Sequence, residues 1–339
     1  MIEPTIYNQK PKTPQNTQCV DAYESGLKEL FFIKNPRFKK EMPEAEEILN
    51  KFLKTNKIKP VWIYYPWRKI IIKSLPEKYY FELRTARNKN VIEKKEQINY
   101  RNLKVGIVGL SVGSAIVHAI VTSGGPKNLK IADFDTLEVS NLNRIKAKLT
   151  DFGQNKTHIA AHEVWELDPF AKLALWDQGI NNKNINQFLL KPKLDVFIDE
   201  MDSLDLKIKA RKICQKNKIP VLMATDNGDG VILDVERFDI EPNRKLFHGL
   251  ASDIENENVS NLDFKRWVNI ATKIVGPSYL TKSMKNSLKE IGKTIAAVPQ
   301  LGTSALMAGS AISYALRMIA SKKNLKSGRY IISLEKNIK

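Results

Sequence analysis

Cysteine is scarce in this chain, with only Cys19 and Cys214 among 339 residues. Two cysteines this far apart argue against a disulfide framework and a cysteine-based zinc site, and they favour a reducing compartment. The N-terminus lacks the apolar core of a signal peptide, and no window reaches the roughly 18 apolar residues of a membrane helix. We therefore expect a cytoplasmic protein with no membrane partner.

Acidic residues are also outnumbered, with 37 Asp and Glu against 55 Lys and Arg, a net charge of +18. Such a balance attracts nucleic acid, an anionic surface or a phosphorylated substrate. The lysines are nevertheless spread over the whole chain, and no arginine-rich stripe with interleaved aromatic residues is present. We interpret the charge as general lysine enrichment, so nucleic acid is not the favoured partner.

The length allows about two domains, or one domain with a large appendage. Residues 1–98 show no nucleotide-binding pattern and are expected to form an N-terminal α+β appendage. Strands alternate with helices over residues 99–240, which predicts an α/β, Rossmann-like, doubly wound and mostly parallel sheet. Residues 241–339 are expected to provide a cleft-covering segment and a C-terminal helix that packs on the core.

The most informative stretch runs from Lys104 to Arg144. Its apolar run Val105–Val108 is long enough for a buried parallel strand. A tight turn containing Gly109, Ser111 and Gly113 then leads into a segment of helical length. The N-terminus of such a helix favours anions, because its free N–H groups and its dipole point toward the ligand.

The second strand of this stretch ends in Asp133 and Asp135. An acidic residue about 20 positions after a glycine turn is typical of nucleotide-binding βαβ units, where it accepts hydrogen bonds from the ribose. The alternative is a tight strand-to-helix turn that packs close to the sheet without a ligand.

Further polar residues follow the ends of the strands: Ser140, Asn141, Arg144, Lys156, Asp202 and Ser203. Because the carboxyl ends of parallel strands meet at one edge of a sheet, these side chains can converge on one ligand. Two cations, an amide and two or three carboxylates suit a nucleoside triphosphate with magnesium. The cations neutralise the phosphates, and a carboxylate holds the metal.

As a set, these residues closely resemble the ThiF/MoeB and ubiquitin-activating-enzyme-like adenylyltransferases, and most of all their MoeY-like, ThiF-domain group. The resemblance covers roughly residues 101–238 and the helix after Pro299. The implied reaction is attack of a substrate carboxylate on the α-phosphate of ATP, which yields an acyl-adenylate and pyrophosphate. The implied cofactors are ATP and Mg.

The resemblance also implies roles for individual residues. Arg144, Lys156 and Asp202 would be catalytic, with Asp202 holding the magnesium ion. The nucleotide would be bound by Gly109, Ser111, Gly113, Asp133 (on the ribose), Asp135, Ser140, Asn141, Arg144, Lys156 and Ser203. The implied substrate is a peptide C-terminus, a small carrier protein or a small acid.

The chain departs from the family in its glycine turn, where Ser111 and Val112 replace two adjacent glycines. Relatives are dimers in which an arginine from an N-terminal helix reaches the ATP of the partner. The resemblance therefore implies a homodimer, with Arg84 and Arg87 as candidates for this trans-acting arginine. A solvated helix face is the alternative for both arginines.

Two other functions use the same fold, namely a nucleotide-dependent oxidoreductase and a degenerate nucleotide-binding module. Arg144, Lys156 and Asp202 argue against the oxidoreductase. A nicotinamide dinucleotide carries only a diphosphate and needs no metal, so it does not require two cations and a metal-binding carboxylate. Activation of a tRNA-linked carboxylate is a variant of the first function, favoured only by the basic charge.

Four further expectations concern the rest of the chain. Cys214 is expected in the buried core, and His248 on the substrate side. Residues 1–25 are expected to be extended or loose. The helix that begins at Glu77 is expected to end near Asn90.

Overall fold

The computed structural model describes residues 3–255, 257, 259 and 262–338. The chain divides into two units, each with its own internal contacts. The first unit consists of Met1–Lys94 and Trp165–Phe170, and the second of Lys95–Val164 and Ala171–Lys339. The chain passes from the second unit into the first near the end of helix α6, which spans Lys156–Leu167.

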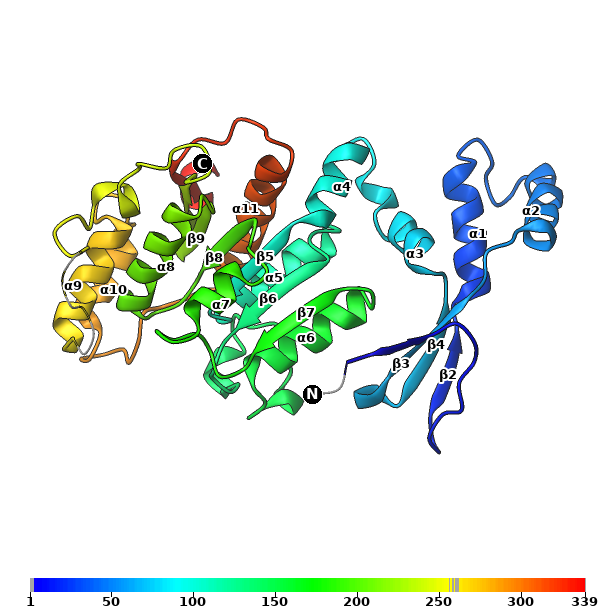
Figure 1. The fold of residues 1–339 in the computed structure, drawn as a ribbon, viewed down its shortest axis with the longest axis horizontal. Helices are drawn as coiled ribbons and strands as arrows, with labels where there is room; N and C mark the ends of the chain where they lie inside the picture. The colour runs from blue at the N-terminus through cyan, green and yellow to red at the C-terminus, as the bar shows by residue number, and fades with distance from the viewer. Residues whose placement is uncertain (1–2, 256, 258, 260–261, 339) are drawn as a thin grey trace. The chain divides into compact units, whose positions relative to one another are not determined.

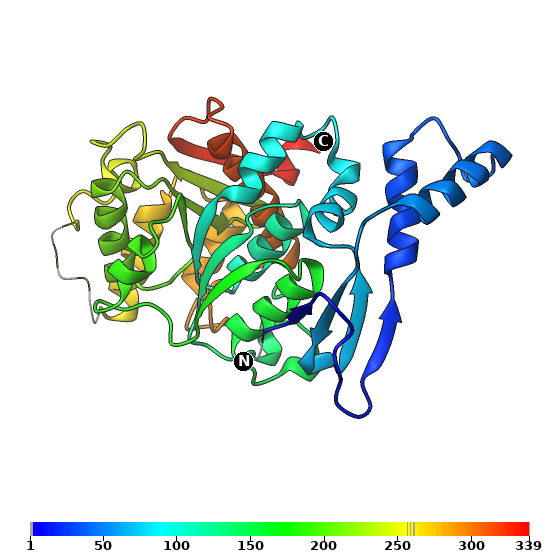
Figure 2. The ribbon, with the colours of Figure 1, turned by 45° about the vertical axis from the view of Figure 1, so that its right-hand side comes forward.

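The first unit contains a four-stranded sheet in the order β1-β3-β4-β2 (Figure 2). Strands β1, β3 and β4 pair antiparallel, and β2 pairs parallel with β4. Its elements are β1 (Thr5–Tyr7), β2 (Gln18–Asp21), α1 (Tyr23–Lys34), α2 (Pro43–Thr55), β3 (Val61–Tyr65), η1 (Pro66–Arg68), β4 (Ile70–Ser74), α3 (Glu77–Arg84) and η2 (Ala86–Asn88).

One expectation for this unit is confirmed and one was wrong. The extended backbone expected in the N-terminal segment is present, because Thr5–Tyr7 and Gln18–Asp21 form strands β1 and β2. All four residues of β2 are exposed, so this edge strand carries no apolar alternation that would reveal it in the sequence. Helix α3 ends at Arg84 and not near Asn90, because Thr85 leaves the helical conformation and only a short 3₁₀ turn follows.

The second unit is built on a seven-stranded sheet in the order β11-β10-β9-β8-β5-β6-β7 (Figure 1). The five strands from β9 to β7 are parallel, and β10 and β11 continue the sheet antiparallel. This topology confirms the predicted doubly wound, mostly parallel sheet.

The strands of this unit are β5 (Lys104–Val108), β6 (Asn128–Ala132), β7 (Lys172–Trp176), β8 (Val196–Asp199), β9 (Val221–Asp226), β10 (Gly230–Glu236) and β11 (Gly328–Ser333). Its α-helices, besides α6, are α4 (Lys94–Asn102), α5 (Val112–Thr122), α7 (Ile185–Leu190), α8 (Leu204–Lys216), α9 (Phe264–Val275), α10 (Lys282–Glu290), α11 (Gly302–Ala320) and α12 (Leu334–Asn337). Short 3₁₀ turns lie at η3 (Val139–Asn141), η4 (Leu149–Asp151) and η5 (Leu246–Gly249).

Helices α5 and α11 pack directly on each other, and α11 also contacts β9 and β10. Gly309 makes the close approach of the two helices possible. A Cβ atom at this position would lie 2.7 Å from the carbonyl oxygen of Ala115 and 2.8 Å from the Cβ of Ala119. The small residues of α11 therefore allow its backbone to pack closely against α5, the helix that begins at the glycine turn.

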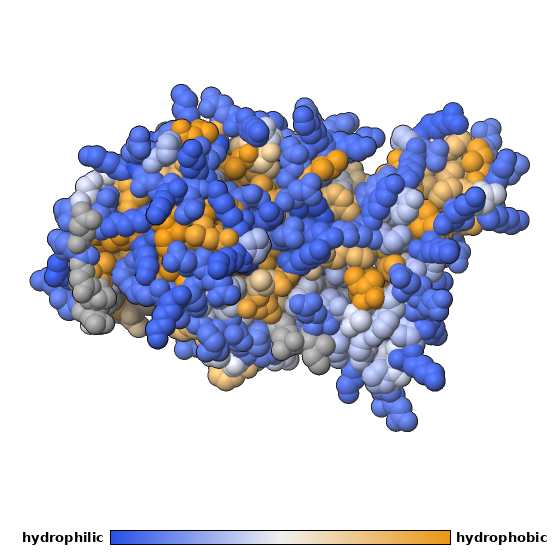
Figure 3. All heavy atoms as spheres, viewed as in Figure 1, coloured by the Kyte–Doolittle hydropathy of each residue, from blue (hydrophilic) through white to orange (hydrophobic). Residues whose placement is uncertain are grey.

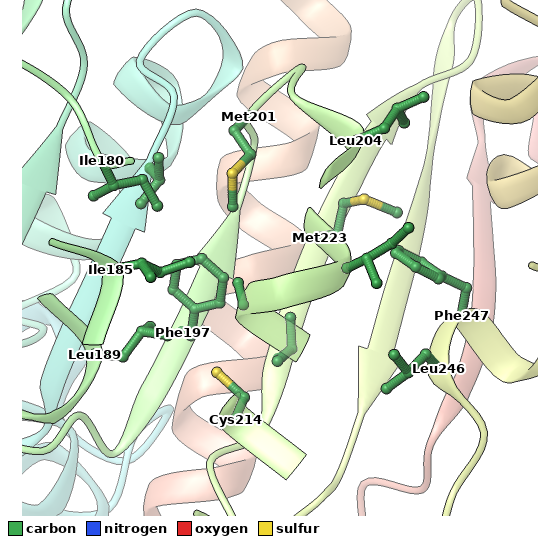
Figure 4. Close-up of a cluster of buried hydrophobic side chains, with 14 of the residues drawn as sticks. Ile180, Ile185, Leu189, Phe197, Met201, Leu204, Cys214, Met223, Leu246 and Phe247 are labelled. Atoms are coloured by element: carbon green, nitrogen blue, oxygen red, sulfur yellow. The ribbon is translucent and has the colours of Figure 1, made fainter. Parts of the chain in front are cut away.

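A large hydrophobic cluster of this unit lies on the opposite face of the sheet. Figure 4 shows its side chains in front of the strands, while α11 passes behind them. Phe197 of β8, Met223 of β9 and Cys214 of α8 belong to this cluster. Cys214 is fully buried, which confirms the expectation for this cysteine, and burial raises the pKa of its thiol.

The surface drawn in Figure 3 is covered mainly by hydrophilic side chains, with apolar atoms exposed as separate patches. Among the helices that the structure describes, none is long and apolar enough to cross a membrane.

Candidate functional site

The turn after β5 is shaped by Gly109, whose φ is +89°. A Cβ atom here would lie 2.3 Å from the carbonyl oxygen of Glu200, on the segment that leaves β8. The amide of Glu200 in turn donates to the carbonyl oxygen of Val108, over 2.9 Å. Both the left-handed conformation and the close backbone approach therefore require glycine at this position.

We expect Gly109→Ala to lower the free energy of unfolding by about 3 kcal/mol, because it combines left-handed strain with a backbone clash. Gly113→Ala is the matched control. A Cβ at Gly113 meets nothing closer than 3.4 Å, and alanine favours the helix, so its stability should stay within about 0.5 kcal/mol. Urea unfolding measures both changes. Equal stability of the two variants would contradict the proposed role of Gly109.

Ser111, at a position where the family resemblance implies glycine, does not need glycine's conformational freedom. Its backbone lies at φ −73° and ψ −83°. Its hydroxyl accepts a hydrogen bond from Nε of Arg144 at 2.7 Å and donates to Oε1 of Gln300 at 3.4 Å. The departure from the family pattern thus supplies a side chain that holds Arg144 over the glycine turn.

Arg144 is half-buried in the loop after β6. Its NH1 group donates to the carbonyl oxygen of Ser140 at 3.2 Å and to Oδ1 of Asn143 at 2.9 Å. Burial lowers the pKa of Arg144, and the negative charges of Asp226 and Asp202 oppose this shift. One guanidinium group therefore lies within the electrostatic reach of two carboxylates from neighbouring strands.

Asp133 is buried at the end of β6. Its Oδ2 accepts from the amide of Leu110 at 2.6 Å and its Oδ1 from the amide of Asp135 at 2.8 Å. Burial raises the pKa of Asp133, although these two hydrogen bonds favour the ionised form. The carboxylate joins the β6 end to the glycine turn, and each oxygen keeps a lone pair for a further donor.

Lys156 begins α6 and forms an ion pair with Asp135, with Nζ 2.8 Å from Oδ2. The lysine side chain is 9% exposed and the aspartate side chain 51%. Lys156 thus places a mostly buried positive charge at the same edge of the sheet as Asp133. A ligand with a higher negative charge can displace its solvated partner, Asp135.

Three of the predicted residues make local hydrogen bonds within their own loops. Asn141 is buried and its Oδ1 accepts from the amide of Glu138 at 3.2 Å, which caps the turn η3. Ser140 is exposed, and its hydroxyl lies 3.4 Å from Oε2 of Glu138. Ser203 occupies the N-cap position of α8, and its hydroxyl donates to the side-chain Oδ1 of Asp205 at 2.5 Å without capping the helix backbone.

Asp202 is exposed on the segment between β8 and α8. Its carbonyl oxygen accepts from Nε1 of Trp267 at 3.2 Å. Within the part of the chain that the structure describes, its carboxylate makes neither a hydrogen bond nor an ion pair. A solvated, uncommitted carboxylate at this edge is available to a ligand.

Arg84 and Arg87 belong to the first unit. Arg84 forms an ion pair there with Asp168, with NH2 3.2 Å from Oδ2, and its side chain is 14% exposed. Arg87 lies in η2 and is exposed. The two candidates therefore differ, because only Arg87 presents an exposed guanidinium group.

Sequence reasoning missed two buried carboxyl groups at the same edge. Glu200 accepts from the amide of Ala224 at 2.8 Å, and burial raises its pKa well above the ordinary value. Asp226 ends β9, and burial raises its pKa to about 7. The sequence could have indicated Asp226 by its position. It comes at the end of a buried apolar strand, and Asp202 likewise comes after one.

His248 has partners on both ring nitrogens, and its placement on the substrate side stays a prediction. Its Nε2 lies 2.9 Å from Oδ1 of Asp234, and Nδ1 accepts from both Nε and NH2 of Arg244. Its φ of +58° follows a φ of +48° at Phe247, so tertiary contacts impose this backbone. Both ring nitrogens are engaged in a network around β10.

The parallel sheet, with polar groups at the carboxyl ends of β5, β6, β8 and β9, defines a Rossmann-like protein with a candidate nucleotide site. The chain belongs to the ThiF family, whose model matches residues 84–331.

Individual relatives agree with this assignment. The uncharacterized protein MT1398 of Mycobacterium tuberculosis is 37% identical over 79% of this chain, and the chain spans only 37% of that protein's length. A tRNA threonylcarbamoyladenosine dehydratase of Bacillus subtilis is 24% identical over 61% of this chain and 80% of its own. The solved structure of E. coli MccB with ATP superposes with a TM-score of 0.52 at 16% identity, covering 92% of this chain and 84% of MccB. This likeness confirms the fold.

Proposed function

We propose that this protein is an ATP-dependent adenylyltransferase that activates a substrate carboxylate. The observation that carries the proposal is the position of Arg144, a half-buried guanidinium group held over the glycine turn within reach of the Asp202 and Asp226 charges. Family membership supports the same reaction, since relatives include a molybdopterin-synthase adenylyltransferase of Haemophilus influenzae.

In this reaction an oxygen of the substrate carboxylate attacks the α-phosphorus of ATP. A new oxygen–phosphorus bond forms, the bond to the oxygen bridging the β-phosphate breaks, and pyrophosphate leaves with that electron pair. Asp133 would accept hydrogen bonds from the ribose, and Gly109, Ser111 and Gly113 would line the phosphates, with Asp135, Ser140, Asn141 and Ser203 shaping the loops around them. Arg144 and Lys156 would offset the charge that develops on the phosphate oxygens, which needs no protein nucleophile.

The residues present fit a magnesium ion that arrives with the nucleotide. No group of three or more His, Cys, Asp or Glu side chains could hold a metal ion among the described residues. Mg²⁺ commonly uses one or two carboxylates together with substrate phosphates, and the uncommitted carboxylate of Asp202 provides such a ligand. When bound, the ion would neutralise negative charge on the phosphates.

The substrate class in this proposal is a carboxylate on a peptide C-terminus, a carrier protein or a small acid. Residues 241–339 would cover the substrate side. In support, the side chain of Asn227, next to the end of β9, accepts from the amide of Thr281 at 2.9 Å and donates to the carbonyl oxygen of Tyr279 at 3.0 Å. The proposed enzyme acts in the cytoplasm as a homodimer in which Arg84 or, with its exposed guanidinium group, Arg87 reaches the ATP of the partner. A monomeric mass in solution would contradict the dimer.

Exchange of labelled pyrophosphate into ATP tests the proposed function. We expect exchange to depend on an added carboxylate from a panel of peptides and small acids, and to depend on magnesium. Asp202→Asn should lower exchange at least 100-fold while the protein stays folded, because the metal-binding carboxylate is lost. Absence of exchange with every acid, combined with tight NAD(H) binding, would instead support the oxidoreductase. Nucleotide binding without any turnover would support a degenerate binding module.

A further inference from the structure

The carboxyl group of Asp226 is the most unusual polar group at the sheet edge. The residue is 6% exposed, and both carboxyl oxygens are buried without a hydrogen-bond partner in the described part of the chain. The side-chain amide of the neighbouring Asn227 does not donate to Asp226, because it is hydrogen-bonded to the backbone of Tyr279 and Thr281. A dry carboxyl group without a donor is costly, which indicates a ligand that supplies positive charge.

The strand register brings Asp226 and the segment that carries Asp202 to the same edge of the sheet. Strands β8 and β9 pair Ile198 with Leu222, and each aspartate lies four residues beyond its member of this pair. Neighbouring strands run about 4.8 Å apart, so two segments that leave the sheet at the same level start close together. The electrostatics agree, because the charges of both aspartates act on Arg144.

Arg144 does not satisfy Asp226. Its hydrogen bonds go to the hydroxyl of Ser111, to the carbonyl oxygen of Ser140 and to the side chain of Asn143. The guanidinium group therefore acts on Asp226 only at a distance. Among the described residues, no cation is in direct contact with either carboxyl group, the exposed one of Asp202 or the buried one of Asp226.

We propose that Asp226 is a second carboxylate ligand, together with Asp202, of the divalent cation that enters with ATP. This inference rests on the proposed function, since ATP must occupy the edge. Hard oxygen ligands from two carboxylates and the phosphates match the coordination that Mg²⁺ prefers. The two aspartates alone are too few to hold the ion, so the metal and ATP should bind cooperatively, and Asp226 should contribute to that cooperativity.

Calorimetric titration of ATP with and without Mg²⁺, in the absence of a carboxylate substrate, tests the inference. For Asp226→Asn we expect the enhancement of ATP affinity by Mg²⁺ to fall at least tenfold. Without metal, ATP should bind this variant as well as the wild type or more tightly, because a negative charge near the phosphates is gone. Mn²⁺ electron paramagnetic resonance should show the same loss of ion binding in the presence of ATP.

Asp229→Asn is the matched control, because it removes the same charge from an exposed residue in the same turn. In Asp229→Asn, Mg²⁺ should raise the affinity for ATP as much as in the wild type. Melting curves should show that both variants are folded. Asp226→Ala provides a second test if the asparagine variant does not fold.

Unchanged Mg²⁺ enhancement in folded Asp226→Asn would overturn the inference, as would ATP binding by the wild type that does not respond to Mg²⁺. Unchanged enhancement with a raised KM for the carboxylate substrate would place a cationic group of that substrate at Asp226 instead. Failure of the proposed function is distinguishable. Pyrophosphate exchange would then be absent with every acid, while the effect of Asp226→Asn on the Mg²⁺ enhancement would remain.

Discussion

Replacing Arg144 with alanine is expected to lower kcat/KM for carboxylate-dependent pyrophosphate exchange by about 10³-fold, or roughly 4 kcal/mol of transition-state stabilisation. The guanidinium group is partly desolvated and oriented in advance by Ser111, with Nε 2.7 Å from the hydroxyl oxygen. A charge that is already oriented needs no reorganisation when negative charge moves onto the pyrophosphate. The steady-state rate of exchange measures the effect.

Two further variants separate orientation from charge. Arg144→Lys keeps the charge but loses the planar fork, so it should recover less than a tenth of the lost activity. Lys146→Ala is the matched control. It removes a cation from the same loop, but that side chain is 52% exposed and contacts Glu163 and His118. Its activity should stay within about twofold of the wild type. Equal losses for Arg144→Ala and Lys146→Ala would show that the general positive potential matters, and not the position of Arg144.

Arg211→Met is expected to lower the free energy of unfolding by about 3–5 kcal/mol. Arg211 is fully buried in α8 and forms ion pairs with Asp199 of β8 and with Glu236 of β10, where Nε lies 2.6 Å from Oε2. Its guanidinium group also lies 4.1 Å from the ring centre of Phe247. Asp199 keeps a second cation in Lys207, at 3.1 Å, so Glu236 is the group that loses most. Urea unfolding measures the change.

The sign of the pH dependence follows from Glu236. Burial already raises its pKa, and the charge of Arg211 opposes that shift. Without Arg211 the pKa of Glu236 in the folded state should lie still further above its unfolded value. A carboxyl group with a raised folded pKa favours folding at low pH, and this contribution is lost as pH rises through the range between the two values. The deficit of Arg211→Met should therefore be smaller at pH 5.5 than at pH 8.

Two controls define this prediction. Adding Glu236→Gln to Arg211→Met should recover part of the stability, because no unpaired charge is left buried. Arg266→Met removes an arginine that is 56% exposed and paired with an exposed glutamate, and it should change stability by less than about 1 kcal/mol. A loss no larger than that of Arg266→Met would contradict the structural role of the Asp199–Arg211–Glu236 network.

The parallel core could be predicted because its strands are short apolar runs between glycine and proline signals. Val105–Val108 and the run that ends at Asp199 are buried throughout and appear as the neighbouring strands β5 and β8. Local composition was sufficient there, since a strand covered on both faces must be apolar at every position.

Helix α4 and strand β2 could not be predicted in the same way. Helix α4 is polar, and tertiary contacts hold it, with the hydroxyl groups of Tyr100 and Ser313 3.0 Å apart and Glu96 2.7 Å from Arg317. Strand β2 is an edge strand with exposed side chains on both faces. Neither element carries a hydrophobic period, because its stability comes from residues distant in the chain.

The sequence by itself determined which polar residues end the strands, and with them the candidate nucleotide site and the family resemblance. Only the tertiary structure decided how these residues pair. It showed that Ser111 orients Arg144, that Gly109 must pass beside Glu200, and that the carboxyl oxygens of Asp226 are buried without a hydrogen-bond partner among the described residues. The physical reason is that strand ends follow from local apolar periodicity. The partner and the solvation of each side chain depend instead on loops and strands that meet from distant parts of the chain.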